Sequence, residues 1–325
     1  MERDNRLDLL RVFAISMIVL MHSPRPDSAP GFLQCGISYL TASGLVLFFM
    51  LSGALLLGNN LSTKDFLRRR FSKIVFPTLF WTFFYLIVKY LGAQISLSDM
   101  CESIISIPLS AQGNGVLWFM YTLSGLYLLT PILSRWLKYA SKREIEFYLL
   151  LWGVTLIYPY LGLWFRINDS NEGILYYFAG YVGYFVLGYY LIHYYKYRLW
   201  HIFVAAVIII IVPLALYSCG KDFDFYSALW YLSLPVAMMA FVFFVMFMRL
   251  PNNKISFISM ISKLSFGIYF VHIFIMRSFI WNLDPITKLP GIVQIPVIAF
   301  VTFVLSLFIS WSISKLHFSK YIIGC

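Results

Sequence analysis

The sequence predicts an all-α protein, a polytopic bundle of membrane-spanning helices with both termini in the cytoplasm. Of its 325 residues, 61% are hydrophobic and 12% are charged, whereas soluble domains carry about 25% charged residues. The apolar runs are long and continuous, which excludes an outer-membrane barrel with its short alternating segments. The basic residues are divided unevenly among the connections, and that division sets the orientation.

We predict about ten spans from the lengths of the apolar runs. They lie near residues 8–24, 37–58, 72–92, 116–134, 147–165, 174–194, 200–217, 226–248, 263–282 and 292–315. The connections are short, so we expect residues 1–325 to form a single membrane-embedded domain. Arg11 interrupts the first apolar run and many spans follow it, so we expect this segment to be retained rather than cleaved as a signal peptide.

The distribution of charge predicts the topology. With the N-terminus in the cytoplasm, 18 Lys and Arg residues lie on that side and four lie outside. The positive-inside rule therefore places both termini in the cytoplasm. The same rule accounts for the net charge of +11, so we expect a lipid bilayer and no nucleic acid as a partner. The four cysteines have no ligand-like spacing, so we expect no metal site.

The first span carries two ionisable residues, Arg11 and His22. A helix turns by roughly 100° per residue, so eleven residues return it to within about 20° of its start and advance it by about 16 Å. Ionisable groups at membrane depth usually face a polar cavity or a partner. Asp8, three residues before Arg11, could pair with it. The alternative is that Arg11 snorkels to the cytoplasmic interface and His22 lies in the outer headgroup layer.

Two features follow in the second and third spans. Ser52 and Gly53 end the string FFMLSG, and small residues in a span usually allow another helix or a ligand to approach closely. The basic cluster that precedes the third span consists of Arg68, Arg69, Arg70 and Lys73. Such a cluster either anchors the helix to anionic lipid or binds phosphates, for which guanidinium groups are well suited.

The remaining candidates lie toward the outer side and in the ninth span. The outer loop 93–115 ends in AQGNGVLWF, and Asn114 and Trp118 are candidates for binding a sugar. A tryptophan there more often belongs to the aromatic belt of the membrane interface. In the ninth span, Tyr269 and His272 are three residues apart and share a helix face. Buried histidines in membranes are usually hydrogen-bonded or functional.

These motifs together resemble acyltransferase family 3, bacterial membrane enzymes that acylate cell-surface glycans. The family's Arg-x₁₀-His is matched by Arg11 and His22, its FFxxSG by Phe48–Gly53, and its RRxxR-I-x-x-P by Arg69 to Pro77 with Lys73 at the third basic position. LWFMYTLSGLYLLTP is similar to its fourth span, and SFGIYFVH is similar to its SYGIYLxH. The resemblance covers nearly the whole chain.

The resemblance implies an acyl-CoA donor, usually acetyl-CoA, that arrives from the cytoplasm, and no permanently bound cofactor. The acceptor would be a hydroxyl of a glycan or lipid-linked sugar, and the location a bacterial cytoplasmic membrane. Some relatives carry an extra esterase-like domain; the single domain expected here would carry out the whole reaction. The basic cluster, with Arg11 and Ser52, would bind the donor.

The resemblance also favours His22 as the central catalytic residue, with Arg11, Tyr269 and His272 as further catalytic candidates. An unperturbed histidine has a pKa of about 6.5, which suits a general base at neutral pH. His22 would deprotonate the acceptor hydroxyl or carry the acyl group transiently, and Tyr269, His272 or Ser52 would supply an oxyanion donor. The rival hypothesis is a transporter of a small metabolite or lipid-linked glycan, with Arg11 and His22 lining its path.

Overall fold

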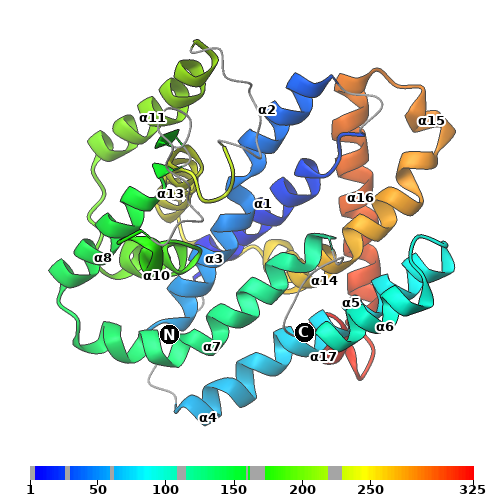
Figure 1. Cartoon of the computed structure of the whole chain (residues 1–325), viewed down its shortest axis with the longest axis horizontal. Helices are drawn as coiled ribbons and strands as arrows, with labels where there is room; N and C mark the ends of the chain where they lie inside the picture. The colour runs from blue at the N-terminus through cyan, green and yellow to red at the C-terminus, as the bar shows by residue number, and fades with distance from the viewer. Residues whose placement is uncertain are drawn as a thin grey trace.

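The protein is a bundle of helices in the computed structural model (Figure 1). The structure describes residues 4–25, 30–58, 62–107, 115–158, 160–161, 173–218 and 229–325, and these contain helices and no strand. Asn114 lies outside the described residues. The all-α architecture predicted from the apolar runs is confirmed for the described residues.

Every predicted span overlaps a helix. The main helices are α1 Asn5–Met21, α2 Gly31–Thr41, α3 Ser43–Leu56, α5 Ser72–Leu91, α7 Trp118–Tyr139, α8 Lys142–Thr155, α10 Val182–His193, α11 Leu199–Ser218, α13 Leu234–Met248, α14 Ser256–Ser278 and α16 Gly291–Ile313. Among the described residues, six segments are long and apolar enough to cross a membrane: Gly31–Leu56, Lys73–Leu91, Gly115–Tyr139, Leu199–Ser218, Ser256–Asn282 and Gly291–Ile313. A count of ten spans and the orientation of the termini stay predictions.

Shorter helices connect these elements. They are α4 Thr63–Phe66, the π-helical turn η1 Leu67–Phe71, α6 Leu97–Ser106, α15 Asp284–Thr287, α17 Ser319–Ile322, and the 3₁₀ turns η2 Gly115–Leu117, η3 Tyr176–Phe178 and η4 Ile280–Asn282. The helix α6 was not expected in the outer loop. It begins with a capping box in which Ser96 and Asp99 satisfy each other's backbone amides. The hydrogen bond from the Ser96 hydroxyl lowers the pKa of Asp99.

Three helix boundaries differ from the predicted ones, each for a local reason. The helix α10 begins at Val182 rather than near 174, because Gly180 has a φ of 96° and a 3₁₀ turn precedes it. The helix α13 begins at Leu234 rather than near 226, with Pro235, which has no N–H to donate, in its first turn. The helix α8 begins at Lys142 because Ser141 and Glu144 form a capping box.

The helix α1 lies in the middle of the bundle, where it packs against α2, α3, α13, α14 and α16. In Figure 1, α8, α10, α11 and α13 lie on one side of it and α5 and α16 on the other. Leu10, Ile15 and Val19 are fully buried on this helix. Polar side chains on α1 are therefore held against several helices at once, which fixes their positions.

The helices α3 and α10 approach each other closely. A Cβ atom on Gly53 would lie 1.8 Å from the carbonyl oxygen of Phe185, and one on Gly188 would lie 1.9 Å from that of Met50. Each backbone therefore occupies the space of the other helix's missing side chain. Of Ser52 and Gly53, Gly53 therefore serves helix packing.

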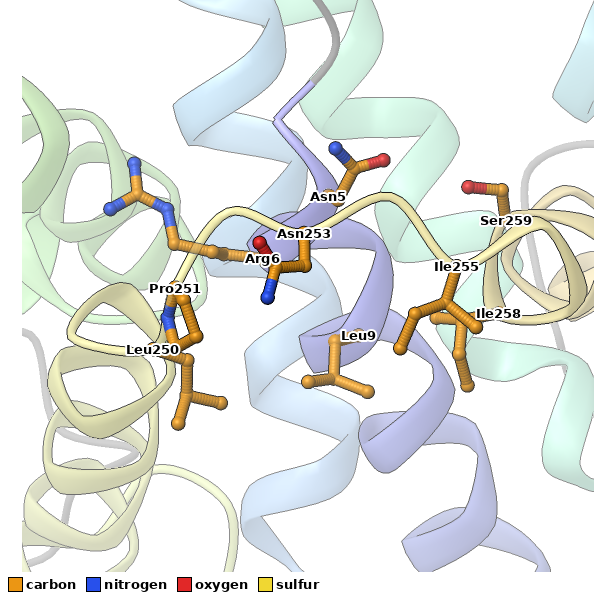
Figure 2. A pocket seen from close by; sticks show the side chains of 9 residues that line it. All are labelled: Asn5, Arg6, Leu9, Leu250, Pro251, Asn253, Ile255, Ile258 and Ser259. Carbon is orange, nitrogen blue, oxygen red and sulfur yellow. The ribbon is translucent and has the colours of Figure 1, made fainter.

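The connection between α13 and α14 crosses the first turns of α1 (Figure 2). Arg6 donates to the carbonyl of Met248 at 2.8 Å, and the backbone N–H of Asn5 donates to Asn252 Oδ1 at 2.9 Å. Arg6 also hydrogen-bonds Asp4 and thereby lowers the pKa of that carboxyl, whose side chain caps the helix. This end of α1 is therefore tied to the C-terminal half of the chain.

One turn further along, Asp8 joins α1 to α14. Its buried carboxylate accepts hydrogen bonds from Ser262 Oγ at 2.7 Å and Ser259 Oγ at 3.2 Å. A buried carboxylate needs such partners, because burial without them is costly. The two helices that carry the candidate histidines are thus held in one register.

Candidate active site

Two histidines from distant parts of the chain meet where α1 ends. His22 is the C-cap residue of α1, and His272 lies within α14. Their ring centroids are 5.3 Å apart in an edge-to-face arrangement. His272 is fully buried, whereas His22 is partly exposed. The packing of α14 on α1 therefore forms a histidine pair from residues 250 positions apart.

The hydrogen bonds of the pair define its tautomers. His22 Nδ1 lies 2.8 Å from the carbonyl oxygen of Ile18, and His272 Nδ1 lies 2.5 Å from that of Tyr269. A carbonyl oxygen only accepts, so each Nδ1 must carry the proton and donate it. In the neutral ring, Nε2 is then the nitrogen with the free lone pair. His272 Nε2 is buried and has no hydrogen-bond partner in the described part of the chain.

A cavity of about 570 Å³ opens beside His22, within the range of about 300–1,000 Å³ typical of small-molecule sites. Its wall includes Trp118, which the sequence singled out. Trp118 stacks on Trp230 at a centroid distance of 6.3 Å and packs against Tyr231 at 5.5 Å. The structure thus places Trp118 on the wall of the His22 cavity.

Two cations also line this cavity, Lys89 from the last turn of α5 and Arg277 from the last turn of α14. Arg277 lies within electrostatic range of both histidines and of Lys89. Its guanidinium is 5.6 Å from the centre of the Trp281 ring. The cavity therefore combines a histidine, an aromatic wall and positive charge.

Tyr269 lies next to the pair but its hydroxyl is engaged. It donates a hydrogen bond to the carbonyl of Val116, and its ring packs on Phe119 at 5.2 Å. Because the phenolic proton is committed to a backbone carbonyl, Tyr269 positions the segment that carries Trp118. It can act as an oxyanion donor only if that bond breaks.

Arg11 lies at a second level, near Ser52 and Tyr127. The Tyr127 hydroxyl lies against Ser52 and within electrostatic range of Arg11 and Arg70. Ser52 and Arg11 thus both lie within range of Tyr127. Arg11 is about 16 Å from His22 along α1, at about 1.5 Å per residue. The structure does not place Ser52 beside the histidine pair, so it joins the group expected to bind the donor.

The four residues of the basic cluster lie in two different elements. Arg68, Arg69 and Arg70 lie in the π-helical turn before α5, with exposed side chains, and η1 packs against α7. Lys73 is exposed one turn later, where its carbonyl oxygen would lie 2.4 Å from a Cβ on Gly324. Arg70 lies within electrostatic range of Tyr127, as Arg11 does.

Another polar hollow, of about 800 Å³, lies at the Asn5 end of α1. Lys254, Lys263 and Ser259 are among its lining residues. Sequence reasoning did not single it out, because these lysines lie in a connection and at a span end, where basic residues are ordinary. It is a second place at which an anionic ligand could enter.

Sequence reasoning also missed several residues of the His22 cavity. Arg277 and Lys89 carried a usable signal, because both are ionisable groups within predicted spans. Trp230 and Tyr231 carried none, because they lie in a segment between helices whose path only the fold reveals. Among the described residues no group of three or more His, Cys, Asp or Glu could hold a metal ion.

The family model for an acyltransferase domain, Acyl_transf_3, matches residues 4–314. The chain belongs to the acyltransferase 3 family. Comparisons with curated proteins and with solved structures found no match. The resemblance read from the motifs is confirmed, and membership of an acyltransferase family together with the long apolar helices indicates an acyl-transferring enzyme of a membrane. Within the matched range lie both the histidine pair and the Arg11 group.

Proposed function

We propose that this protein transfers an acyl group, normally acetyl, from cytoplasmic acyl-CoA to a hydroxyl of a cell-surface or lipid-linked glycan, within a bacterial cytoplasmic membrane. The observation that carries the proposal is the state of His22 at the cavity wall. Its Nδ1–H is committed to the Ile18 carbonyl, so its Nε2 is the basic nitrogen beside a space large enough for a sugar.

The reaction needs one proton transfer and one acyl transfer. His22 Nε2 takes the proton of the acceptor hydroxyl while the hydroxyl oxygen attacks the thioester carbonyl. The C–S bond then breaks, and the proton on His22 passes to the departing CoA sulfur. In the two-step variant, Nε2 itself takes the acyl group and CoA leaves as its thiolate. The acceptor hydroxyl then attacks the acyl-imidazolium, the acyl C–N bond breaks to restore neutral His22, and the hydroxyl proton passes through solvent to the thiolate.

The donor would approach along α1 from the Arg11 level. Arg70 and its neighbours in η1 provide guanidinium groups for the phosphates of CoA. Arg11, Ser52 and Tyr127 lie further in and would contact the pantetheine arm. The thioester would then reach His22 about 16 Å further along the helix. The guanidinium groups near Arg11 suit the phosphates of CoA, and the basic nitrogen of His22 suits a reaction at the thioester.

His272 supports His22 without lining the cavity itself. When His22 takes a proton, positive charge develops in a buried site, where a neighbouring uncommitted acceptor stabilises it. His272 offers one, because its Nδ1–H is held by the Tyr269 carbonyl and its Nε2 has no other partner among the residues described. Held in this tautomer, His272 is a positioning residue rather than an oxyanion donor.

The test is acyl transfer by purified protein in detergent. With labelled acetyl-CoA and glycan acceptors, we expect release of CoA and label on the acceptor. Rapid acid quenching before the acceptor is added tests for label on the protein, which distinguishes the two-step variant from direct transfer. Absence of CoA release with every acceptor, together with substrate movement across sealed vesicles, would instead support the transporter hypothesis.

A further inference from the structure

We infer that the acceptor of this enzyme is an anionic sugar, one that carries a carboxylate or a phosphate beside its reacting hydroxyl, and that Arg277 binds this group. The inference rests on the proposed function and specifies its acceptor. The wall of the His22 cavity combines aromatic and cationic side chains, which can recognise a particular class of sugar.

The charge on the described wall of the cavity is positive. Of the twelve described residues that line it, Lys89 and Arg277 are cationic and none is acidic. In the part of the chain that the structure describes, the guanidinium of Arg277 contacts the Trp281 ring and no carboxylate. A guanidinium group forms stronger hydrogen bonds with a carboxylate or a phosphate than with the neutral hydroxyls of a sugar.

The position of this charge points to the acceptor rather than to CoA. Arg277 lies five residues after His272 and within electrostatic range of His22, at the C-terminal end of α1. The phosphates of CoA would bind near Arg70, at the Arg11 level of the same helix. An anion at Arg277 would therefore belong to the molecule that reacts at His22 from the cavity side.

The aromatic wall supplies the recognition of a ring. Trp118 and Trp230 stack with an angle of 27° between their planes, and Tyr231 extends this surface. Aromatic faces carry negative potential and attract the polarised C–H bonds of a sugar face. A sugar stacked there with its anionic substituent at Arg277 would present a hydroxyl to His22.

There is a plainer explanation for both cations. Each lies in the last turn of its helix, where positive charge is favourable, and Arg277 could simply anchor α14 at the membrane interface. That explanation predicts no preference for charged acceptors. The two explanations therefore differ in a measurable way.

The experiment compares three acceptors with one ring: methyl glucoside, methyl glucuronide and glucose 6-phosphate. Transfer from acetyl-CoA is followed by CoA release, and binding without acetyl-CoA is followed by calorimetry. We expect at least one anionic acceptor to have a kcat/KM and an affinity about tenfold above those of methyl glucoside, as a charge-assisted hydrogen bond gives. The uronide and the phosphate distinguish a carboxylate from a phosphate substituent.

Variants then assign the preference. Arg277→Met should remove it by raising KM for the anionic acceptor, Arg277→Lys should keep part of it, and Lys288→Met, which changes an exposed cation outside the cavity, should leave it intact. Equal binding of all three sugars, or an Arg277→Met variant that raises KM for acetyl-CoA instead, would overturn the inference. A preference in binding with no transfer to any acceptor would contradict the proposed function and leave the anionic site standing.

Discussion

At the scale of single residues, the chemistry depends on which nitrogen of each histidine is free. The carbonyls of Ile18 and Tyr269 hold the two Nδ1–H groups, so the same backbone hydrogen bonds that orient the rings also select their tautomers. Neither hydrogen bond can be predicted from the sequence, because the sequence does not specify how a histidine ring is rotated about its side-chain bonds. The residue types were predictable, whereas their protonation geometry required the structure.

The positioning role of His272 can be tested by substitution. His272→Leu should lower kcat about tenfold with little change in either KM, because the acceptor beside the developing charge is lost while both binding sites remain. His272→Gln should recover part of kcat, since its carbonyl oxygen can accept a hydrogen bond. Steady-state kinetics measures both values. A rise in KM with kcat unchanged would contradict this role.

The donor route makes a separate residue-scale prediction. Arg70→Ala should raise KM for acetyl-CoA several-fold, because Arg70 lies within electrostatic range of Tyr127 and offers a guanidinium group to a phosphate. The matched substitution Lys263→Ala, in the hollow at the Asn5 end, should not. Competition binding with CoA measures the effect directly. The reverse result would place the donor's nucleotide in that hollow instead.

At the scale of elements, the periodicity of the sequence predicts the helices but not their exact boundaries or partners. These depend on capping residues and on specific contacts between helices. The apolar runs located the helices, but the boundaries of α8 and α10 depend on the Ser141–Glu144 box and on the positive φ of Gly180. The box has a sequence signature and could have been found; the conformation of a single glycine could not. The pairing of α1 with α14 likewise depends on Asp8 and its two serines, which are some 250 residues away in sequence.

The contact between α3 and α10 gives a prediction for stability. Gly188→Ala should destabilise the protein by about 1–3 kcal/mol or more, because its Cβ would overlap the Met50 carbonyl and force the helices apart. Gly153→Ala is the matched control, because the added Cβ would meet no described atom within 4 Å beyond the neighbouring backbone of its own helix. Thermal unfolding in detergent compares them. An equal Tm for both variants would contradict the close packing.

At the scale of the whole molecule, the distribution of charge predicts a direction for the reaction. If both termini lie in the cytoplasm, as the charge distribution predicts, Arg70 would lie on the donor side and the His22 cavity would open toward the outer side. The proposed acyl path would then run along α1 between these two ends. Helix geometry alone predicts that Arg11 and His22 share one face of α1, whereas the meeting of His22 with His272 depends on the packing of α14 against α1.

The orientation is testable with cysteines already present. Cys101 and Cys325 are both exposed, and the predicted topology places Cys101 outside and Cys325 in the cytoplasm. In single-cysteine variants, a membrane-impermeant thiol reagent should label Cys101 in intact cells and Cys325 only after permeabilisation. Labelling of Cys325 in intact cells would reverse the direction proposed for acyl transfer.

The most direct test of the account is the turnover of a His22→Ala variant. Loss of a general base lowers the rate by about 10²–10⁴-fold, and we expect a fall in kcat of that size with the KM for acetyl-CoA unchanged. His193→Ala is the matched control, because His193 makes the same kind of Nδ1 contact, to the Tyr189 carbonyl at 2.9 Å, and does not line the cavity. A folded His22→Ala protein that acylates at the full rate would contradict the central claim.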